Sequence, residues 1–280
     1  MLELLQYDFM RYALVAAVVT GVTAPAIGTF VVQRRLALLG DGLGHVALTG
    51  VALGLLTGLA PVLTAVLVAA AGAVLIEVLR IYGRTSGDVA LAMLFYGGLA
   101  GGVLLTNLAG DSASVLNSYL FGSIVTVDRD DLVAVVVLGA VVLAVTLLLT
   151  PQLFAVCQDE EHARVSGVPT RLYGILVAVL AAVTITVAMR TVGLLLVSAL
   201  MVVPVAAAQQ VSRTFRGTHL LAMLLGLAAA VGGVVVSFEI DTQPGPTIVL
   251  LALGTFAVLA LGRGVRSRLL RRRDRPLELA

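Results

Sequence analysis

Nine long apolar stretches constrain this chain more than any other feature of its sequence. A helix that crosses the hydrocarbon core of a bilayer needs about 20 apolar residues, so a chain of this length has room for about eight to ten spans. Charged residues make up only 12% of the chain, about half of their share in a soluble domain. The sequence therefore predicts an all-α integral membrane protein, a polytopic helical bundle that forms one transmembrane domain over residues 1–280. The predicted spans are 12–32, 38–59, 62–82, 88–108, 131–151, 172–190, 193–211, 219–238 and 247–263.

Arginines on alternate connections predict the orientation of these spans. Short cytoplasmic loops are enriched in basic residues, and one orientation places five basic groups on the same side, with only Arg129 and Arg190 opposing it. We therefore expect a multi-pass membrane protein with its C-terminus in the cytoplasm and its N-terminus outside. The five groups are Arg34 with Arg35, Arg80 with Arg84, Arg164 with Arg171, Arg213 with Arg216, and the basic tail 263–280.

The absence of lysine excludes one class of function. All 18 basic residues are arginine, so the phosphate-binding pattern GxxxxGK[ST] cannot occur, and any ATP hydrolysis must come from a separate subunit. Neither HExxH nor GxSxG occurs, which argues against an intramembrane enzyme. The single cysteine, Cys157, excludes an internal disulfide and a thiolate cluster. We expect no permanently bound cofactor and no nucleic-acid partner.

Three ionisable residues within predicted spans are candidate metal ligands, because such residues are costly in a bilayer. Asp41 and His45 have the i, i+4 spacing that stacks side chains on one face of a helix. Glu77 lies at a comparable depth on the third span. Carboxylate and imidazole ligands suit Zn²⁺, Mn²⁺ or Fe²⁺, and the imidazole is neutral near pH 7 because ordinary histidine titrates near about 6.5. The alternatives are that Asp41 caps a helix, that His45 packs against neighbours, and that Glu77 pairs with Arg80.

The connection at 152–171 is the longest polar stretch between spans and is predicted to be a cytoplasmic coupling loop. Its segment DEEHAR predicts a short amphipathic helix with acidic residues in the first turn, ended by Gly167 and Pro169. We expect this loop to dock on a separate ATPase. The alternative is an ordinary solvated connector. The proposed contact residues are Asp159, Glu160, Glu161, His162, Ala163 and Gly167.

Two segments are predicted to form the outer mouth. The connection at 109–130 contains the apolar stretch SYLFGSIV and predicts a short surface or re-entrant helix, which is tolerated at membrane depth where it lines a cavity. The segment EIDTQPGPTIV supplies Glu239 and Asp241, which would attract cations. Ordinary turn chemistry explains the same residues equally well.

Three blocks together resemble the zinc and manganese ABC transporter permease family: RRLALLGDGLGHVALTGVALG, RTVGLLLVSALMVVPVAAAQQ and VSFEIDTQPGPTIVL. The resemblance extends over nearly the whole chain and implies the importer fold of the vitamin B12 and metal-chelate type. It also implies a second permease copy, two cytoplasmic ATPase subunits and an extracytoplasmic metal-binding protein. Asp41 and His45 match the family's DxxxH motif, and QDEEHARVSG matches its coupling helix. Gly42 and Gly44 depart from the Ser, Leu or Thr that is usual there.

The leading hypothesis is thus the permease subunit of an importer for a divalent metal ion: zinc, manganese or iron. A permease for a larger chelate, such as a siderophore or cobalamin, shares the architecture but does not require intramembrane Asp and His ligands. A stand-alone channel or carrier would work without partners, and carriers often contain inverted repeats, of which the sequence shows no convincing example. Neighbouring genes for an ATPase and a metal-binding lipoprotein would decide the class.

Overall fold

A computed structural model describes residues 7–82, 87–110, 118–123, 129–189 and 192–273. Every regular element in this part of the chain is a helix, as the composition predicts. A single helical turn at 118–121 lies in the predicted outer connection. The other helices are α1 (Asp8–Gln33), α2 (Leu39–Thr57), α3 (Pro61–Tyr82), α4 (Gly87–Leu108), α6 (Arg129–Leu148), α7 (Thr150–Gln158), α8 (Glu160–Val165), α9 (Thr170–Ala188), α10 (Leu194–Val211), α11 (Phe215–Glu239) and α12 (Pro244–Arg273).

Each of the nine predicted spans coincides with a helix. Within the described residues, eight of them are long and apolar enough to cross a membrane, and α10 is a shorter apolar helix that contains Pro204. The predicted fold class is confirmed. The span predicted at 131–151 ends earlier, at Leu148, and a separate helix, α7, follows it. Arg84, Arg190, most of the loop 109–130 and the tail 274–280 lie outside the described residues.

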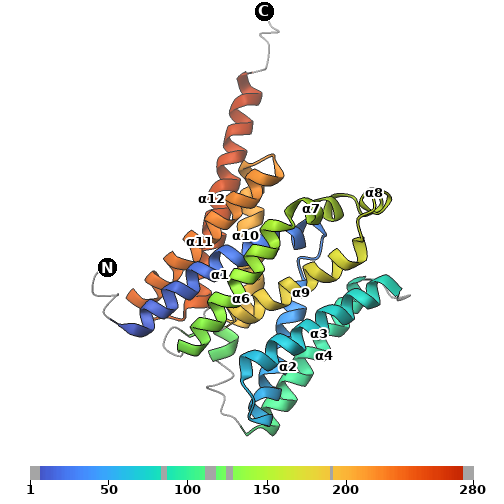
Figure 1. The fold of residues 1–280 in the computed structure, drawn as a ribbon. Helices are drawn as coiled ribbons and strands as arrows, with labels where there is room; N and C mark the ends of the chain where they lie inside the picture. The colour runs from blue at the N-terminus through green and yellow to red at the C-terminus, as the bar shows by residue number, and fades with distance from the viewer. Residues whose placement is uncertain (1–6, 83–86, 111–117, 124–128, 190–191, 274–280) are drawn as a thin grey trace, which may run out of the picture.

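The helices differ in how much of their surface the bundle covers. In α1 and α2, 72% of the apolar window is buried, against 17% in α12. Exposed leucines and valines cover the outward faces of α4, α6 and α12, as expected of helices that face lipid. Figure 1 shows α2, α3 and α4 as a group beside the remaining helices, and α12 projecting beyond the bundle. α1, α2, α9 and α10 thus supply most of the interior.

Small residues allow this close packing. A Cβ atom at Gly28 of α1 would lie 2.0 Å from the carbonyl oxygen of Met201 on α10, so only glycine fits. Threonine hydroxyls inside the spans donate to the carbonyl one turn earlier, which satisfies them without water. These threonines are Thr20, Thr23, Thr29, Thr106, Thr184 and Thr186.

The bundle has two distinct ends. At the α8 end, the connection between α1 and α2 meets the end of α3 and the start of α9, where Arg34 contacts Glu77 and Gly174. At the mouth end, Phe9, the 122–123 segment and residues 237–238 and 241–244 surround one cavity. The arginines at positions 34, 80 and 171 therefore share one end, as the alternation of basic connections predicts. Which compartment each end faces remains a prediction.

Candidate ion site between α2 and α10

Asp41 and His45 lie one turn apart at the start of α2. Asp41 is half-buried, and only 7% of His45 is exposed. The His45 ring lies edge-on to Phe95 with centroids 4.5 Å apart, and its Nδ1 has no hydrogen-bond partner among the described residues. The residue at the helix N-cap is Leu38, which makes no side-chain capping bond. A buried polar atom without a partner is costly, and the role of His45 as a metal ligand remains a prediction.

Asp41 is held by the neighbouring helix. The Ser198 hydroxyl on α10 donates a hydrogen bond to Asp41 Oδ1, and Asp41 itself lies in the first turn of α2. The two helices approach closely here because position 40 has no side chain: a Cβ atom at Gly40 would lie 2.8 Å from the Ser198 Cβ. A carboxylate of α2 and a hydroxyl of α10 therefore meet at this contact, and His45 follows Asp41 one turn along the same face of α2.

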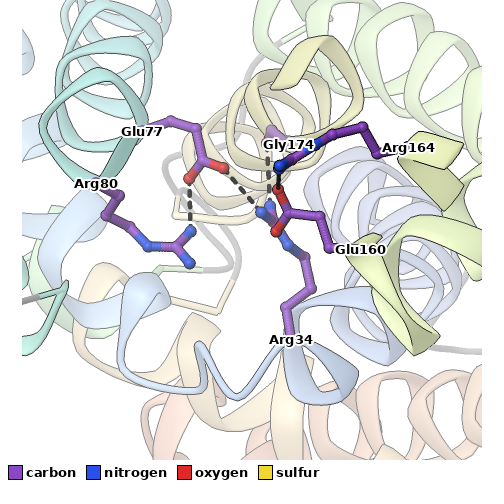
Figure 2. Close-up of polar contacts among 6 residues, drawn as sticks. All are labelled: Arg34, Glu77, Arg80, Glu160, Arg164 and Gly174. Atoms are coloured by element: carbon purple, nitrogen blue, oxygen red, sulfur yellow. Dashed lines mark hydrogen bonds and ion pairs between the residues drawn. The ribbon is translucent and has the colours of Figure 1, made fainter. Parts of the chain in front are cut away.

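Glu77 lies in a different environment, shown in Figure 2. Its Oε1 accepts from Arg34 Nη2 at 2.8 Å, and its Oε2 accepts from Arg80 Nη1 at 2.7 Å. The pairing with Arg80 that the sequence offered as an alternative is present. Both carboxylate oxygens are engaged, and the described residues contain no group of three or more His, Cys, Asp or Glu side chains able to hold a metal. The structure does not join Glu77 to Asp41 and His45, and its role as a third ligand remains a prediction.

A cavity of about 300 Å³ extends from the ion pairs of Glu77 with Arg34 and Arg80 to the start of α2. Its lining includes the charged residues Arg34, Arg35, Glu77, Arg80 and Asp88 together with Leu39 and Leu91.

The single cysteine, Cys157, lies on α7. Burial raises the pKa of its thiol to about 11, and this effect outweighs the nearby Arg34 charge, which lowers the pKa. The thiol stays protonated near pH 7 and offers no thiolate to a metal.

The two predicted mouth residues are exposed at the opposite end of the bundle. Asp241 has a left-handed backbone, with φ of 52°, and lines a cavity of about 530 Å³ together with Gly122 and Ser123 of the predicted outer connection. Glu239 ends α11 and is not part of this lining. The structure thus brings the two predicted outer segments together at Asp241.

The predicted helix in the coupling loop is present as α8. The Asp159 carboxylate caps it by accepting from the His162 amide at 2.9 Å, and Ala163 is buried. The helix ends at Val165, and Gly167 follows with a left-handed φ of 84°, the conformation expected after a helix C-terminus. Glu160 and Arg164 form an exposed pair at 3.1 Å. Docking of this helix on an ATPase is not tested by its shape.

Two polar residues in the spans were not identified from the sequence. Ser198 gives no sequence signal, because a serine on an apolar helix is common. His219 lies in α11, buried between Phe30 and Phe215, and neither ring nitrogen has a partner among the described residues. An ionisable residue in a predicted span is a functional candidate, and that signal was available for His219.

The described helices form a polytopic bundle, and eight of them are long and apolar enough to cross a membrane. The model of the ABC 3 transport family matches residues 6–262. The chain belongs to this family.

Several relatives share most of its length. The chelated iron transport system membrane protein YfeD of Yersinia pestis is 32% identical over 91% of this chain and 85% of its own. The manganese transport system membrane protein MntC of Halalkalibacterium halodurans is 30% identical over 91% and 88%. The zinc uptake system membrane protein ZnuB of Haemophilus influenzae is 27% identical over 90% and 97%.

Two solved structures share the fold. PsaBC from Streptococcus pneumoniae, in complex with a Fab, has a TM-score of 0.83 and 29% identity, covering 91% of this chain and 92% of its own. A metal-chelate type ABC transporter in an inward-facing conformation has a TM-score of 0.68 at 17% identity, covering 90% and 86%. The fold predicted from the sequence, the importer permease type, is therefore confirmed.

Proposed function

We propose that this permease moves a divalent transition metal ion, zinc or manganese with iron as a further candidate, into the cytoplasm. One observation carries the proposal: Asp41 and His45 lie on one face of α2, Asp41 accepts a hydrogen bond from Ser198 of α10, and the buried His45 Nδ1 has no partner among the described residues. Oxygen and nitrogen ligands of this kind suit divalent first-row metals. The names of the manganese, zinc and iron relatives agree with this chemistry.

The proposed assembly contains two copies of this chain, a cytoplasmic ATPase under each copy, and an extracytoplasmic metal-binding protein. The α8 end faces the cytoplasm, where the arginines of the short connections belong. Val165 at the end of α8 is 88% exposed. An apolar side chain left in water does not stabilise the loop, so its exposure supports a docking role for α8. The mouth end faces the binding protein.

Co-reconstitution tests the proposed function. The chain is purified with the ATPase subunit of an ATP-binding-cassette metal importer, placed in proteoliposomes with the metal-binding protein, and assayed for ATP-dependent uptake of radioactive Mn²⁺ and Zn²⁺. Val165→Asp places an unpaired charge in the proposed interface, which costs about 2 to 5 kcal/mol, so uptake should fall at least about tenfold. Val165→Ala, the matched control, should stay within about twofold. Concentrative uptake by the chain without ATPase, or wild-type rates in Val165→Asp, would contradict the proposal.

Charge at the mouth should affect how fast ions enter. Neutralising both residues, Glu239→Gln with Asp241→Asn, is expected to lower the initial uptake rate about threefold to tenfold at low salt, because a cleft lined by one sign of charge concentrates counter-ions. The effect should shrink at high salt, since exposed charges act over a Debye length of about 8 Å at physiological ionic strength. Asparagine tolerates the left-handed backbone at position 241. The control is Asp130→Asn, an exposed acid that does not line the mouth cavity. An equal loss of uptake rate in the double variant and the control, or a loss that does not depend on salt concentration, would refute electrostatic attraction of ions by the mouth.

A further inference from the structure

Ser198 of α10 contacts Asp41, the first residue of the polar pair on α2. It lies in the second turn of α10, and its hydroxyl meets the Asp41 carboxylate across 157 sequence positions. The helices run antiparallel at this point: Gly40 faces Ser198, and one turn further along α2 Gly44 faces Leu194. Neither position on α2 carries a side chain that would separate the helices. The close approach therefore delivers the Ser198 oxygen to the ligand face of α2.

The chemistry of a serine hydroxyl allows two uses of this contact. Its proton satisfies one acceptor of the carboxylate when no cation is present, and its oxygen retains lone pairs that can face a cation. Oxygen is a hard ligand, which suits Mn²⁺ better than it suits soft metals. Neither role is available to the apolar residues that surround Ser198 on α10.

We propose that Ser198 completes the ion site, holding Asp41 in position while the site is free of metal and offering its oxygen to the metal when it binds. The proposal rests on the proposed function and deepens it by naming a residue that sets metal preference. With Asp41 and His45 it forms a set of two oxygens and one nitrogen that joins α2 to α10. The ion then bridges the two helices that the hydrogen bond from Ser198 to Asp41 also joins.

Three substitutions of Ser198 test this inference by metal competition in the reconstituted complex. Ser198→Ala should lower Mn²⁺ uptake about tenfold, within the range known for residues that support metal ligands. Ser198→Thr keeps the hydroxyl and should remain within about threefold. Ser198→Cys replaces oxygen by sulfur and should shift the ratio of Cd²⁺ to Mn²⁺ uptake at least about tenfold towards Cd²⁺, because sulfur ligands favour soft metals. A residue that only packs would not change this ratio.

The control for a lost hydroxyl is Thr184→Val on α9, whose side chain donates to the carbonyl of Leu180 in its own helix. It should keep wild-type uptake and competition. Wild-type Mn²⁺ uptake in Ser198→Ala, or an unchanged Cd²⁺ to Mn²⁺ ratio in Ser198→Cys, would overturn the role of Ser198. If Asp41→Ala still lost uptake in the same assay, the proposed function would stand without it. Normal uptake in Asp41→Ala as well would instead reject the ion site as a whole.

Discussion

Replacing Asp41 or His45 by alanine is expected to lower metal uptake at least about a hundredfold. Partners of metal ligands already contribute about tenfold to a hundredfold to affinity, so a direct ligand should contribute at least as much. The burial of His45, which is only 7% exposed, adds to this expectation, because water does not replace a lost ligand readily inside the bundle. Uptake of radioactive Mn²⁺ and Zn²⁺ by the reconstituted complex measures the loss.

Conservative variants separate ligation from packing at these two positions. Asp41→Asn keeps the size of the side chain and an oxygen that can accept from Ser198, but it removes the charge. It should therefore lose most uptake, whereas a purely structural residue would tolerate it. His45→Phe fills the space beside Phe95 and should fold, yet should transport no more than the alanine variant. Each variant must still co-purify with the ATPase. Uptake at wild-type rates in Asp41→Asn or His45→Phe would return the pair to a role in packing.

The sequence predicts the helices well because the bilayer imposes a simple rule on them. Each span must be long, apolar and internally hydrogen-bonded, and all nine predicted spans are helices. Boundaries were less accurate where no polar residue marks them. The apolar stretch 131–151 reads as one span, but the helix ends at Leu148 and restarts at Thr150, with Pro151 in the first turn of α7. Proline is favoured at such a position, and this was the available signal.

The candidate site was predictable only in its local part. Asp41 and His45 share one helix, so their spacing alone places them on one face. Ser198 lies 157 positions from Asp41, and no local pattern predicts a contact over that separation. The structure explains Gly42 and Gly44, the two glycines that depart from the family pattern. Cβ atoms at Gly42 and Gly44 would lie 3.3 Å from Leu91 of α4 and Leu194 of α10, so both positions support close helix packing.

The environment of Glu77 was likewise predictable only in its local part. Its depth in the span suggested a ligand, and the i+3 spacing to Arg80 suggested an ion pair, but Arg34 comes from 43 positions away. Gly174 on α9 accepts a hydrogen bond from Arg34 and leaves room for the Glu77 carboxylate, because a Cβ atom at position 174 would lie 2.4 Å from Glu77 Oε1. The resulting cluster joins α3, α9 and the connection between α1 and α2 at the α8 end (Figure 2).

Replacing Glu77 by glutamine is expected to destabilise the folded protein by about 3 to 5 kcal/mol, the cost of removing one partner from a buried ion pair. The side chains of Glu77 and Arg34 are only 5% and 7% exposed. Without the carboxylate, the Arg34 guanidinium keeps one carbonyl contact, to Gly174 at 3.3 Å, and its charge has no counter-charge. The free energy of unfolding, from denaturant titration in mixed micelles, measures the change.

The chain supplies a matched control for this prediction. Glu160 and Arg164 form an ion pair at 3.1 Å, but their side chains are 50% and 60% exposed, and exposed pairs contribute about 1 kcal/mol or less. Glu160→Gln should therefore change stability little. A double variant, Arg34→Met with Glu77→Met, should recover much of the loss, since apolar residues of similar volume often replace a buried pair without cost. If Glu77→Gln were as stable as the wild type and yet lost metal uptake, Glu77 would act on the ion, as its position in the span first suggested, and the cluster would not be an anchor of the fold.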